Sequence, residues 1–294
     1  MKILALDMGG TFIKWALMDK ATLNILEKGR YDTKAKNHSG LEIIWNMSKF
    51  AQQMKNKHKD IECVCSTMVG IIDTDRYIVL SPNHTLRGYE GMHIKEEFGK
   101  YCKLPLYVAN DVKAAALGEI NMGALKGRKN VNAIVMALGT GIAGAVVIDG
   151  KNYMGNNYAS GECGQMLVNG NLFEMYYSVP ALIVRCEQVY GKTLTGEGCL
   201  ALALTNVKVK RVVDEWYDGI AKAIMYYIYI VNPKYVILGG KIAEDVNFSI
   251  ERLNKIIMKL AQKPLSSFQQ VEILKAKLGN DAALYGVASL CKSK

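Results

Sequence analysis

Residues 4–17 read LALDMGGTFIKWAL, two apolar runs separated by a pair of glycines. This pattern predicts two β-strands joined by a tight turn. Gly9 and Gly10 let backbone amides approach phosphate oxygens closely, and Thr11 adds a hydroxyl donor. Asp7, at the end of the first strand, is suited to hold Mg²⁺ through water, because Mg²⁺ prefers oxygen ligands and keeps several waters. An ordinary hairpin remains the alternative, since Gly-Gly turns are common.

A second glycine turn, GTGIAG, occupies residues 139–144 and matches the G-x-G-x-x-G pattern of dinucleotide-binding proteins. That pattern requires a helix directly after the glycines, so that the helix N-terminus faces a pyrophosphate. Residues 145–148 read AVVI, which favours a strand instead. We therefore predict a second glycine hairpin here rather than the site of a nicotinamide-dependent oxidoreductase.

The rest of the chain alternates strands and helices. Residues 39–54 have the apolar spacing of an amphipathic helix with Ser39 as its cap, and residues 61–66 are typical of a buried strand. Helices are predicted over 173–190 and along 213–231, where Pro233 ends the second one. Because a glycine hairpin occurs in each half, we expect an α/β protein with two lobes of related design.

Asn110 and Asp111 stand between a short strand and an alanine-rich helix. A carboxylate in this position can project into a cleft and take a proton from a hydroxyl group. Helix capping is the other interpretation, because Asp caps helices well.

Two further groups of residues favour a small-molecule site. Glu162, Gln165 and Glu174 border a glycine-rich loop, where they could bind sugar hydroxyls, although scattered surface polar residues are an equal alternative. Gly239 and Gly240 follow an apolar strand, where a nucleotide could lie against bare backbone, or where a plain turn leads into a helix.

Composition limits the classes of protein. The chain has 294 residues, of which 50% are hydrophobic, enough for a sizeable core. Neither a secretory signal nor a run of transmembrane length is apparent, so we expect a cytoplasmic protein without membrane contact. The net charge of +10 is spread along the chain, which favours a solvated basic surface over nucleic-acid binding.

The chain has seven cysteines, an odd number scattered among apolar residues. We expect reduced, buried thiols, as at Cys63, Cys65, Cys186 and Cys291. Cys63 and Cys65 are separated by one residue in a predicted strand, from which we expect side chains on opposite faces and no shared metal ion.

Six segments together resemble the ROK family of bacterial sugar kinases and repressors. In order they are DMGGTFIK, AND, LGTGIAG, GECGQM, VILGGKIA and LGNDAALYG, and they extend over nearly the whole chain. The resemblance implies an actin-like ATPase (ribonuclease H-like) fold with ATP and Mg²⁺ in a cleft between two lobes. It implies a smaller lobe of residues 1–112 with about 280–294, and a larger lobe of residues 113–279 that holds the adenosine site and forms a homodimer.

The same resemblance assigns roles to individual residues. Asp111 matches the catalytic base, which would activate the 6-hydroxyl of a sugar. Phosphate and nucleotide contacts fall on Asp7, Gly9, Gly10, Thr11, Lys14, Thr140, Gly141, Gly239 and Gly240. Sugar contacts fall on Asn83, Asn110, Asp111, Glu162, Gln165 and Glu174.

Two departures from the family pattern bear on the substrate. Most members have a histidine where this chain has Gln165, and a cysteine cluster before the glutamate that matches Glu174. The sequence therefore predicts no structural zinc and an altered sugar preference. The zinc-less relatives suggest an N-acetylmannosamine kinase, with a glucose or β-glucoside kinase as the alternative. A sugar-responsive regulator without catalysis is a third possibility, but the repressor branch adds a DNA-binding segment before the first glycine motif, where only six residues stand here.

Overall fold

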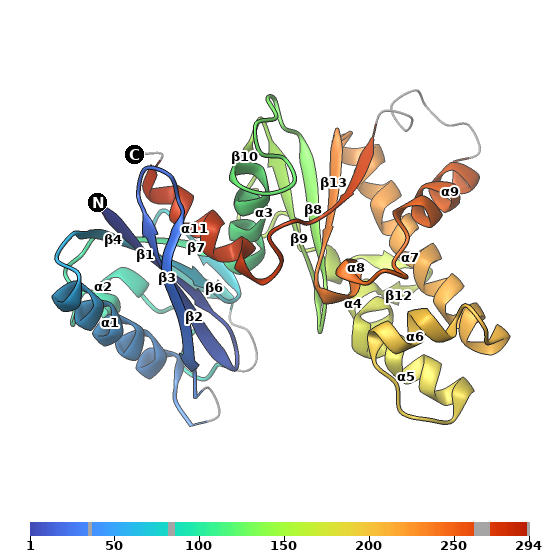
Figure 1. Cartoon of the computed structure of the whole chain (residues 1–294), viewed down its shortest axis with the longest axis horizontal. Coiled ribbons are helices and arrows are strands. Elements are labelled where there is room, and N and C mark those ends of the chain that lie inside the picture. Colours follow the sequence, from blue (N-terminus) through green and yellow to red (C-terminus); the bar gives the residue numbers. More distant parts are fainter. Residues whose placement is uncertain (35–36, 82–85, 262–270, 293–294) are drawn as a thin grey trace. The chain divides into compact units, whose positions relative to one another are not determined.

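A computed structural model describes residues 1–34, 37–81, 86–261 and 271–292. The chain divides into two compact units by the contacts within each (Figure 1). Unit 1 comprises Met1–Met122, Met154–Ala159 and Asp281–Lys294. Unit 2 comprises Gly123–Tyr153 and Ser160–Asn280. Each unit is built around one mixed five-stranded sheet.

The sheet of unit 1 has the strand order β3-β2-β1-β4-β7. β1 is antiparallel to β2 and parallel to β4, which is in turn parallel to β7. The carboxyl ends of β1, β4 and β7 therefore lie at one edge of the sheet. The strands are β1 (Lys2–Met8), β2 (Phe12–Asp19), β3 (Ile25–Asp32), β4 (Ile61–Met68) and β7 (Leu106–Asn110), with a small hairpin of β5 (Ile71–Asp73) and β6 (Ile78–Ser81) beside them.

Both faces of this sheet are covered, because successive side chains of β1 enter different cores. Leu4 and Leu6 pack with α1 (Gly40–Lys57), whereas Ile3 and Ala5 pack with α11 (Ala282–Lys292). α1 begins at Ser39 with the predicted cap, completed by a reciprocal bond with Glu42. The other helices of unit 1 are α2 (Ile94–Phe98) and α3 (Asp111–Asn121), and η2 (Gly279–Asp281) is a 3₁₀ turn before α11.

Helices α3 and α11 touch backbone to backbone. A side chain at Gly118 would overlap the carbonyl of Ala282, and one at Gly286 would overlap the carbonyl of Ala114. Two glycines thus bring helices from distant parts of the sequence into close contact, and both helices belong to unit 1.

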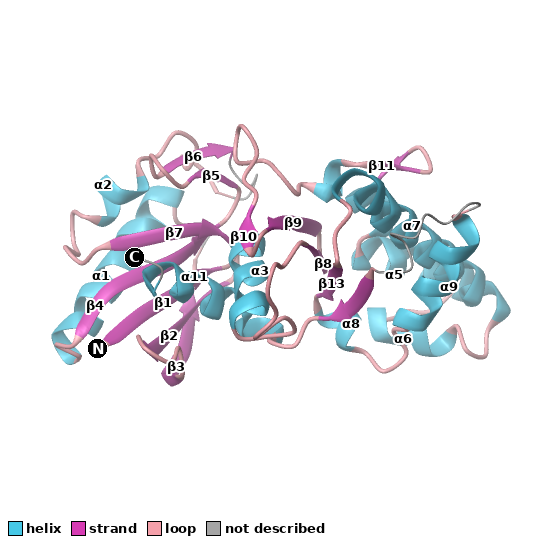
Figure 2. Ribbon diagram, turned by 90° about the horizontal axis from the view of Figure 1, so that it is seen from above, coloured by secondary structure: helices cyan, strands magenta, loops and turns pink. Residues whose placement is uncertain are grey.

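The sheet of unit 2 has the order β10-β9-β8-β13-β14, and β8, β13 and β14 run parallel. Figure 2 labels four of these strands, β8, β9, β10 and β13. Its strands are β8 (Ala133–Leu138), β9 (Ile142–Ile148), β10 (Lys151–Asn152), β13 (Tyr235–Gly239) and β14 (Glu272–Lys275), with a short pair of β11 (Leu167–Val168) and β12 (Asn171–Leu172). Its helices are η1 (Cys163–Gln165), α4 (Phe173–Tyr177), α5 (Val179–Tyr190), α6 (Gly196–Leu202), α7 (Val207–Val231), α8 (Lys241–Glu244) and α9 (Ile250–Leu260).

Helix α7 forms the centre of the unit 2 core. Its fully buried Trp216 donates from Nε1 to the carbonyl of Tyr177 over 2.6 Å, and its Tyr217 stacks on Phe248. The helix predicted over 173–190 is two helices, because Ser178 has an extended backbone and α5 starts again with Pro180 in its first turn.

Both glycine turns join antiparallel strands, β1 to β2 and β8 to β9, as predicted. The absence of a helix directly after Gly144 excludes the dinucleotide-binding interpretation of this segment, because β9 continues through it.

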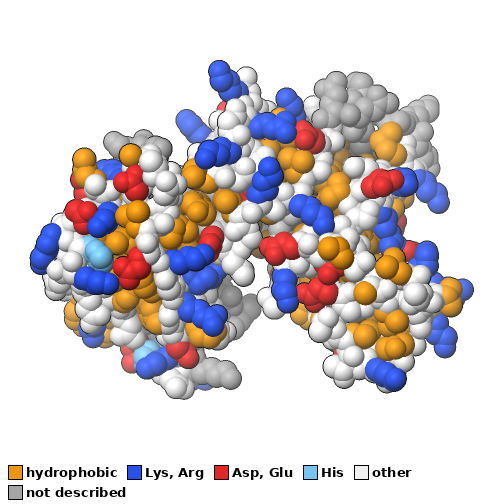
Figure 3. All heavy atoms as spheres, viewed as in Figure 1, with side chains coloured by type: hydrophobic (Ala, Val, Ile, Leu, Met, Phe, Trp, Pro, Cys, Tyr) orange, Lys and Arg blue, Asp and Glu red, His pale blue; other side chains and the backbone are white. Residues whose placement is uncertain are grey.

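The surface carries charge of both signs. Figure 3 shows Lys and Arg side chains spread over the visible face, with acidic side chains among them. None of the helices in the described ranges is long and apolar enough to cross a membrane.

Candidate active site

The first group of predicted site residues lies at the carboxyl end of β1. Asp7 is buried, and its carboxylate accepts a 2.8 Å hydrogen bond from the Thr67 hydroxyl and lies 2.7 Å from Lys14 Nζ. Thr67 Oγ1 in turn accepts from the amide of Met8 over 2.9 Å. The carboxylate is therefore held in one orientation by a neighbouring strand and by a lysine of the same hairpin.

The glycine turn itself is held by β3 and the residue after it. Thr33 donates from its hydroxyl to the carbonyl of Gly9 over 2.7 Å and from its amide to the carbonyl of Thr11 over 2.8 Å. Gly10 and Thr11 are exposed, and a Cβ added at Gly10 would meet no atom within 4 Å. Such a turn presents open space beside bare backbone, which a phosphate group needs.

Asn110 and Asp111 lie at the same edge of the sheet as Asp7. Asn110 pairs with Met68 at the end of β4, one residue after Thr67. Its side chain accepts from the amides of Val112 and Lys113 and donates to the carbonyl of Gly70 over 3.0 Å. Asn110 is thus the helix cap of α3, and the half-buried Asp111, its first residue, also accepts from the amide of Val112 over 2.9 Å.

Two buried residues next to Asp111 were not predicted. The side chain of Lys113 is buried in the first turn of α3 and donates to the carbonyl of Tyr158, whose hydroxyl donates to Asp75 over 2.7 Å. These bonds attach the segment 154–159 to unit 1. The hydroxyl of Tyr89 is fully buried with no hydrogen-bond partner in the described part of the chain, and burial, followed by the charge of Asp111, raises the pKa of this phenol.

In unit 2 the turn Gly139-Thr140-Gly141 is fixed by Glu174. The Oε2 atom of Glu174 accepts from the amide of Ile142 over 2.8 Å. Gly139 donates to the carbonyl of Gly141 over 3.0 Å and accepts from the amide of Val179 over 3.0 Å. Thr140 is exposed. Glu174, a predicted sugar ligand, thus braces the predicted phosphate turn with one of its oxygens.

Gly239 and Gly240 lie beside this turn, because β13 is parallel to β8 and pairs with it up to Gly239. Gly240 has φ +94°, and a side chain there would overlap the carbonyl of Leu138. Only glycine combines this backbone conformation with this close packing. The second and third glycine motifs therefore meet at one edge of the unit 2 sheet.

Two of the remaining predicted sugar ligands, Glu162 and Gln165, are in or next to η1. Glu162 precedes η1, and its charge, after burial, contributes to raising the pKa of the Cys163 thiol to about 12. Gln165 ends η1 and is exposed. Asn83 lies outside the described residues.

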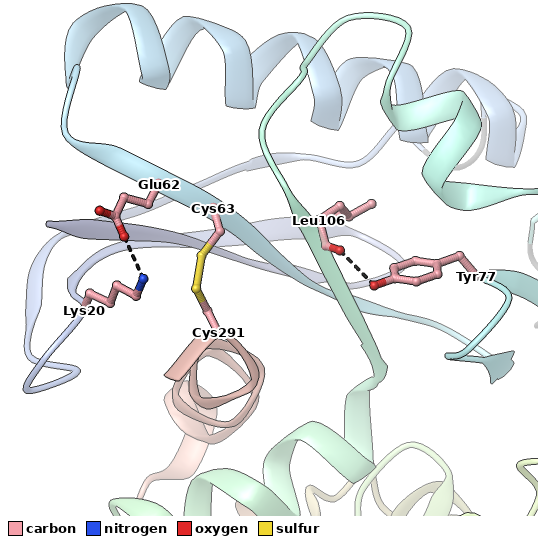
Figure 4. The surroundings of a disulfide bond; sticks show 6 residues. All are labelled: Lys20, Glu62, Cys63, Tyr77, Leu106 and Cys291. Carbon is pink, nitrogen blue, oxygen red and sulfur yellow. Dashed lines mark hydrogen bonds and ion pairs between the residues drawn. A yellow bond between two sulfur atoms is a disulfide. The ribbon is translucent and has the colours of Figure 1, made fainter. Parts of the chain in front are cut away.

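The cysteine predictions were wrong in two respects. A disulfide joins Cys63 of β4 to Cys291 of α11, whereas reduced thiols were expected at both (Figure 4). Cys63 and Cys65 point to the same face of β4, since residues two apart in a strand share a face. The sulfur atoms of Cys63, Cys65 and Cys291 all lie within 4.8 Å of one another. A thiol cluster is therefore present, against the expectation that none exists, and its sulfur atoms are close enough to hold one metal ion, which counts against the expected absence of zinc.

The other cysteines of the described part of the chain are free and buried, as predicted for Cys65 and Cys186. Burial raises the pKa of the Cys65 thiol to about 12, against the smaller effects of the Cys291 amide and the Lys20 charge.

Comparison with solved structures shows the fold. A ROK hexokinase from Thermus thermophilus superposes with a TM-score of 0.81 at 22% identity, covering 98% of this chain and 97% of the other. A ROK glucokinase from Streptomyces griseus, solved with glucose and AMPPNP, gives 0.79 at 21% identity, with both chains covered in full, 100% each. The two mixed five-stranded sheets are thus those of the actin-like ATPase fold that these proteins share.

Sequence relatives include both kinases and regulators. An uncharacterised protein of Clostridium perfringens is 31% identical over 96% of this chain and 94% of its own length. The xylose repressor of Bacillus subtilis is 24% identical over 97% of this chain and 75% of its own length. The β-glucoside kinase of Listeria monocytogenes is 24% identical over 85% and 86%. The ROK family matches residues 3–294, and the chain belongs to this family of sugar kinases and regulators.

Proposed function

We propose that the protein is an ATP-dependent sugar kinase in which Asp111 is the general base. The observation that carries this proposal is the placement of Asp111 and Asp7 at the same sheet edge, each at the end of a parallel strand. Both carboxylates accept a hydrogen bond within unit 1: Asp7 from the hydroxyl of Thr67, and Asp111 from the amide of Val112. One acid then has the position of a proton acceptor, and the other is beside the phosphate turn.

Phosphoryl transfer depends on alignment and on neutralising charge rather than on covalent chemistry by the protein. In the proposed reaction the sugar hydroxyl oxygen bonds to the γ-phosphorus while the bond from that phosphorus to the β–γ bridging oxygen breaks. The hydroxyl proton passes to Asp111, and ADP leaves with the bridging oxygen. The exposed turns at Gly10 and Thr140 offer backbone amides to phosphate oxygens.

A magnesium ion fits the chemistry of the Asp7 side chain. Mg²⁺ prefers oxygen ligands such as carboxylates. A magnesium ion bound to ATP would neutralise charge on the phosphates. Because Lys14 and Thr67 each contact one oxygen of Asp7, we infer that Asp7 would hold such an ion through water.

The substrate we propose is N-acetylmannosamine, phosphorylated at its 6-hydroxyl. The reasons are Gln165 in the place of the family's usual histidine, and the lack of the cysteine cluster before Glu174. The exposed Gln165 side chain supplies both a donor and an acceptor. Glucose or a β-glucoside is the alternative substrate, since a β-glucoside kinase is among the relatives.

The test is an ADP-release assay with each of N-acetylmannosamine, N-acetylglucosamine, glucose and cellobiose. The highest kcat/KM is expected with N-acetylmannosamine. A higher kcat/KM with glucose or cellobiose would show that the proposed substrate is wrong, while the protein would still be a sugar kinase. The Asp111→Asn enzyme serves as the control for ATP hydrolysis by contaminants.

A non-catalytic, sugar-responsive regulator is the second candidate, favoured by the similarity to the xylose repressor. Such a protein would bind sugar without consuming ATP. Sugar binding by calorimetry, combined with no ADP release from any of the four sugars, would establish it and exclude the kinase.

We also propose that the protein acts as a homodimer. Sedimentation equilibrium measures this directly, and a single species with the mass of one 32.5 kDa chain would contradict it.

A further inference from the structure

Three of the four cysteines of unit 1 lie close together, two on a strand and one on a helix from the far end of the sequence. Cys63 and Cys65 stand on one face of β4, and Cys291 stands in the last turn of α11. Figure 4 shows the side chains of Cys63 and Cys291 pointing toward each other between the strand and the helix. We propose that this cluster, once its disulfide is reduced, binds one thiophilic divalent cation, of which Zn²⁺ is the representative.

The distances among the sulfur atoms fit a common ion. All three lie within 4.8 Å of one another. Two thiolates bound to one tetrahedral zinc at about 2.3 Å each are separated by just under 4 Å, so small side-chain movements complete the set. No His, Asp or Glu of the described ranges joins the group at this separation, so the fourth position would go to a ligand from outside the chain.

The surroundings select a soft cation. The three cysteines are 2%, 0% and 5% exposed and lie among Ile3, Ala288 and other apolar side chains. Thiolates favour zinc, cadmium and monovalent copper, whereas Ca²⁺ and Mg²⁺ prefer oxygen ligands.

Charge is also accounted for. Three thiols that bind Zn²⁺ release three protons and leave a net charge of −1 on the complex. Lys20, at the end of β2, lies close enough to Cys65 for its ammonium charge to act on that sulfur, and it pairs with Glu62 over 2.7 Å. The Lys20 charge favours the anionic complex, and the paired Glu62 carboxylate offsets part of this effect.

Disulfide and ion are alternative states of the cluster, because the Cys63–Cys291 bond uses two of the three ligands. A dithiol reductant converts this bond into two thiols and is itself oxidised to a disulfide. The ion then takes over the connection between β4 and α11 that the disulfide makes. Metal binding at this cluster would support the structure of unit 1 and does not require kinase activity.

The test uses the full chain, reduced anaerobically with a phosphine that is then removed. Cd²⁺ is added, and the ultraviolet charge-transfer absorption between thiolate and cadmium is followed. Saturation is expected at one ion per chain, with three protons released, and Zn²⁺ should displace Cd²⁺. The oxidised protein should bind neither ion at this site.

Matched variants separate this site from other thiols. Cys65→Ser should weaken binding by at least about 100-fold, since one of three ligands is lost. Cys186→Ser removes one thiol of another buried pair, in which Cys186 and Cys199 are hydrogen-bonded, and should bind Cd²⁺ like the wild type. Circular dichroism confirms that each reduced protein is folded.

Three results would overturn the proposal. They are a folded, reduced wild type that shows no cadmium absorption, a Cys65→Ser protein that binds as tightly as the wild type, or binding that Cys186→Ser abolishes.

Discussion

The hydroxyl of Thr67 connects two strands at the candidate site, because it donates to the carboxylate of Asp7 over 2.8 Å and accepts from the amide of Met8 over 2.9 Å. Thr67 is fully buried, so neither bond competes with solvent. The orientation of Asp7 toward its surroundings therefore depends on a residue 60 positions away in the sequence.

Thr67→Val removes this hydroxyl at nearly constant volume. It leaves a buried carboxylate oxygen and a buried amide without their partner, so the free energy of unfolding should fall by about 1–3 kcal/mol. The KM for MgATP should rise as well, because Asp7 loses its fixed orientation. Urea denaturation and steady-state kinetics measure the two effects. Thr67→Ser keeps the hydroxyl and should retain the KM; a KM as high as that of Thr67→Val would mean that the hydroxyl does not position Asp7.

Asp111→Asn tests the proposed base. The amide cannot accept the hydroxyl proton, so kcat should fall by about 10²–10⁴-fold while the unfolding transition stays close to that of the wild type. Asp60→Asn is the matched control, because Asp60 comes just before β4, at the opposite end of that strand from Thr67. The kcat of the Asp60→Asn enzyme should equal that of the wild type. Near-normal turnover by Asp111→Asn would remove Asp111 from the mechanism.

Local patterns were enough to predict much of the architecture. The glycine pairs between apolar runs predicted both hairpins, and Ser39 with the apolar spacing after it predicted α1. The comparisons confirm the actin-like fold that the family resemblance implied.

The sequence could not show contacts that depend on register between distant strands. Nothing near Thr67 in the sequence indicates that it meets Asp7, since that contact requires β4 to pair with β1 in one particular register. The Cys63–Cys65–Cys291 cluster was missed for a simpler reason. Side chains two apart in a strand share a face, and α11 returns to cover that face from the far end of the chain.

Glu97 provides a test of pH-dependent stability in unit 1. Its carboxylate lies 2.6 Å from Lys100 Nζ and accepts from Trp45 Nε1 over 2.8 Å, and these bonds, Lys100 first, lower its pKa below 4.5. A carboxyl group whose pKa is lowered on folding stabilises the fold above its unfolded pKa, and this contribution is lost as pH falls through the folded value.

Glu97→Gln should therefore be less stable than the wild type at pH 7, and the difference should shrink progressively below pH 4.5. Urea denaturation at a series of pH values measures it. Glu96→Gln, the exposed neighbour on the same helix, controls for a general effect of removing one negative charge. A difference between Glu97→Gln and wild type that persists unchanged in acid would show that packing, not charge, is responsible.

Gly286→Ala tests whether α11 supports the helix that carries Asp111. The added methyl group would overlap the carbonyl of Ala114, one turn into α3, so the two helices must separate. Overpacking of this kind costs about 1–3 kcal/mol or more, and thermal unfolding should shift down accordingly. Because α3 begins at Asp111, kcat should fall as well, even where the protein is fully folded.

Gly198→Ala, in α6 of unit 2, is the control, because a methyl group there meets only ordinary or slightly tight contacts and should be neutral to mildly stabilising. If Gly286→Ala lowered stability but left kcat intact, the position of Asp111 would not depend on α11, and the support of α3 by this helix would be purely structural.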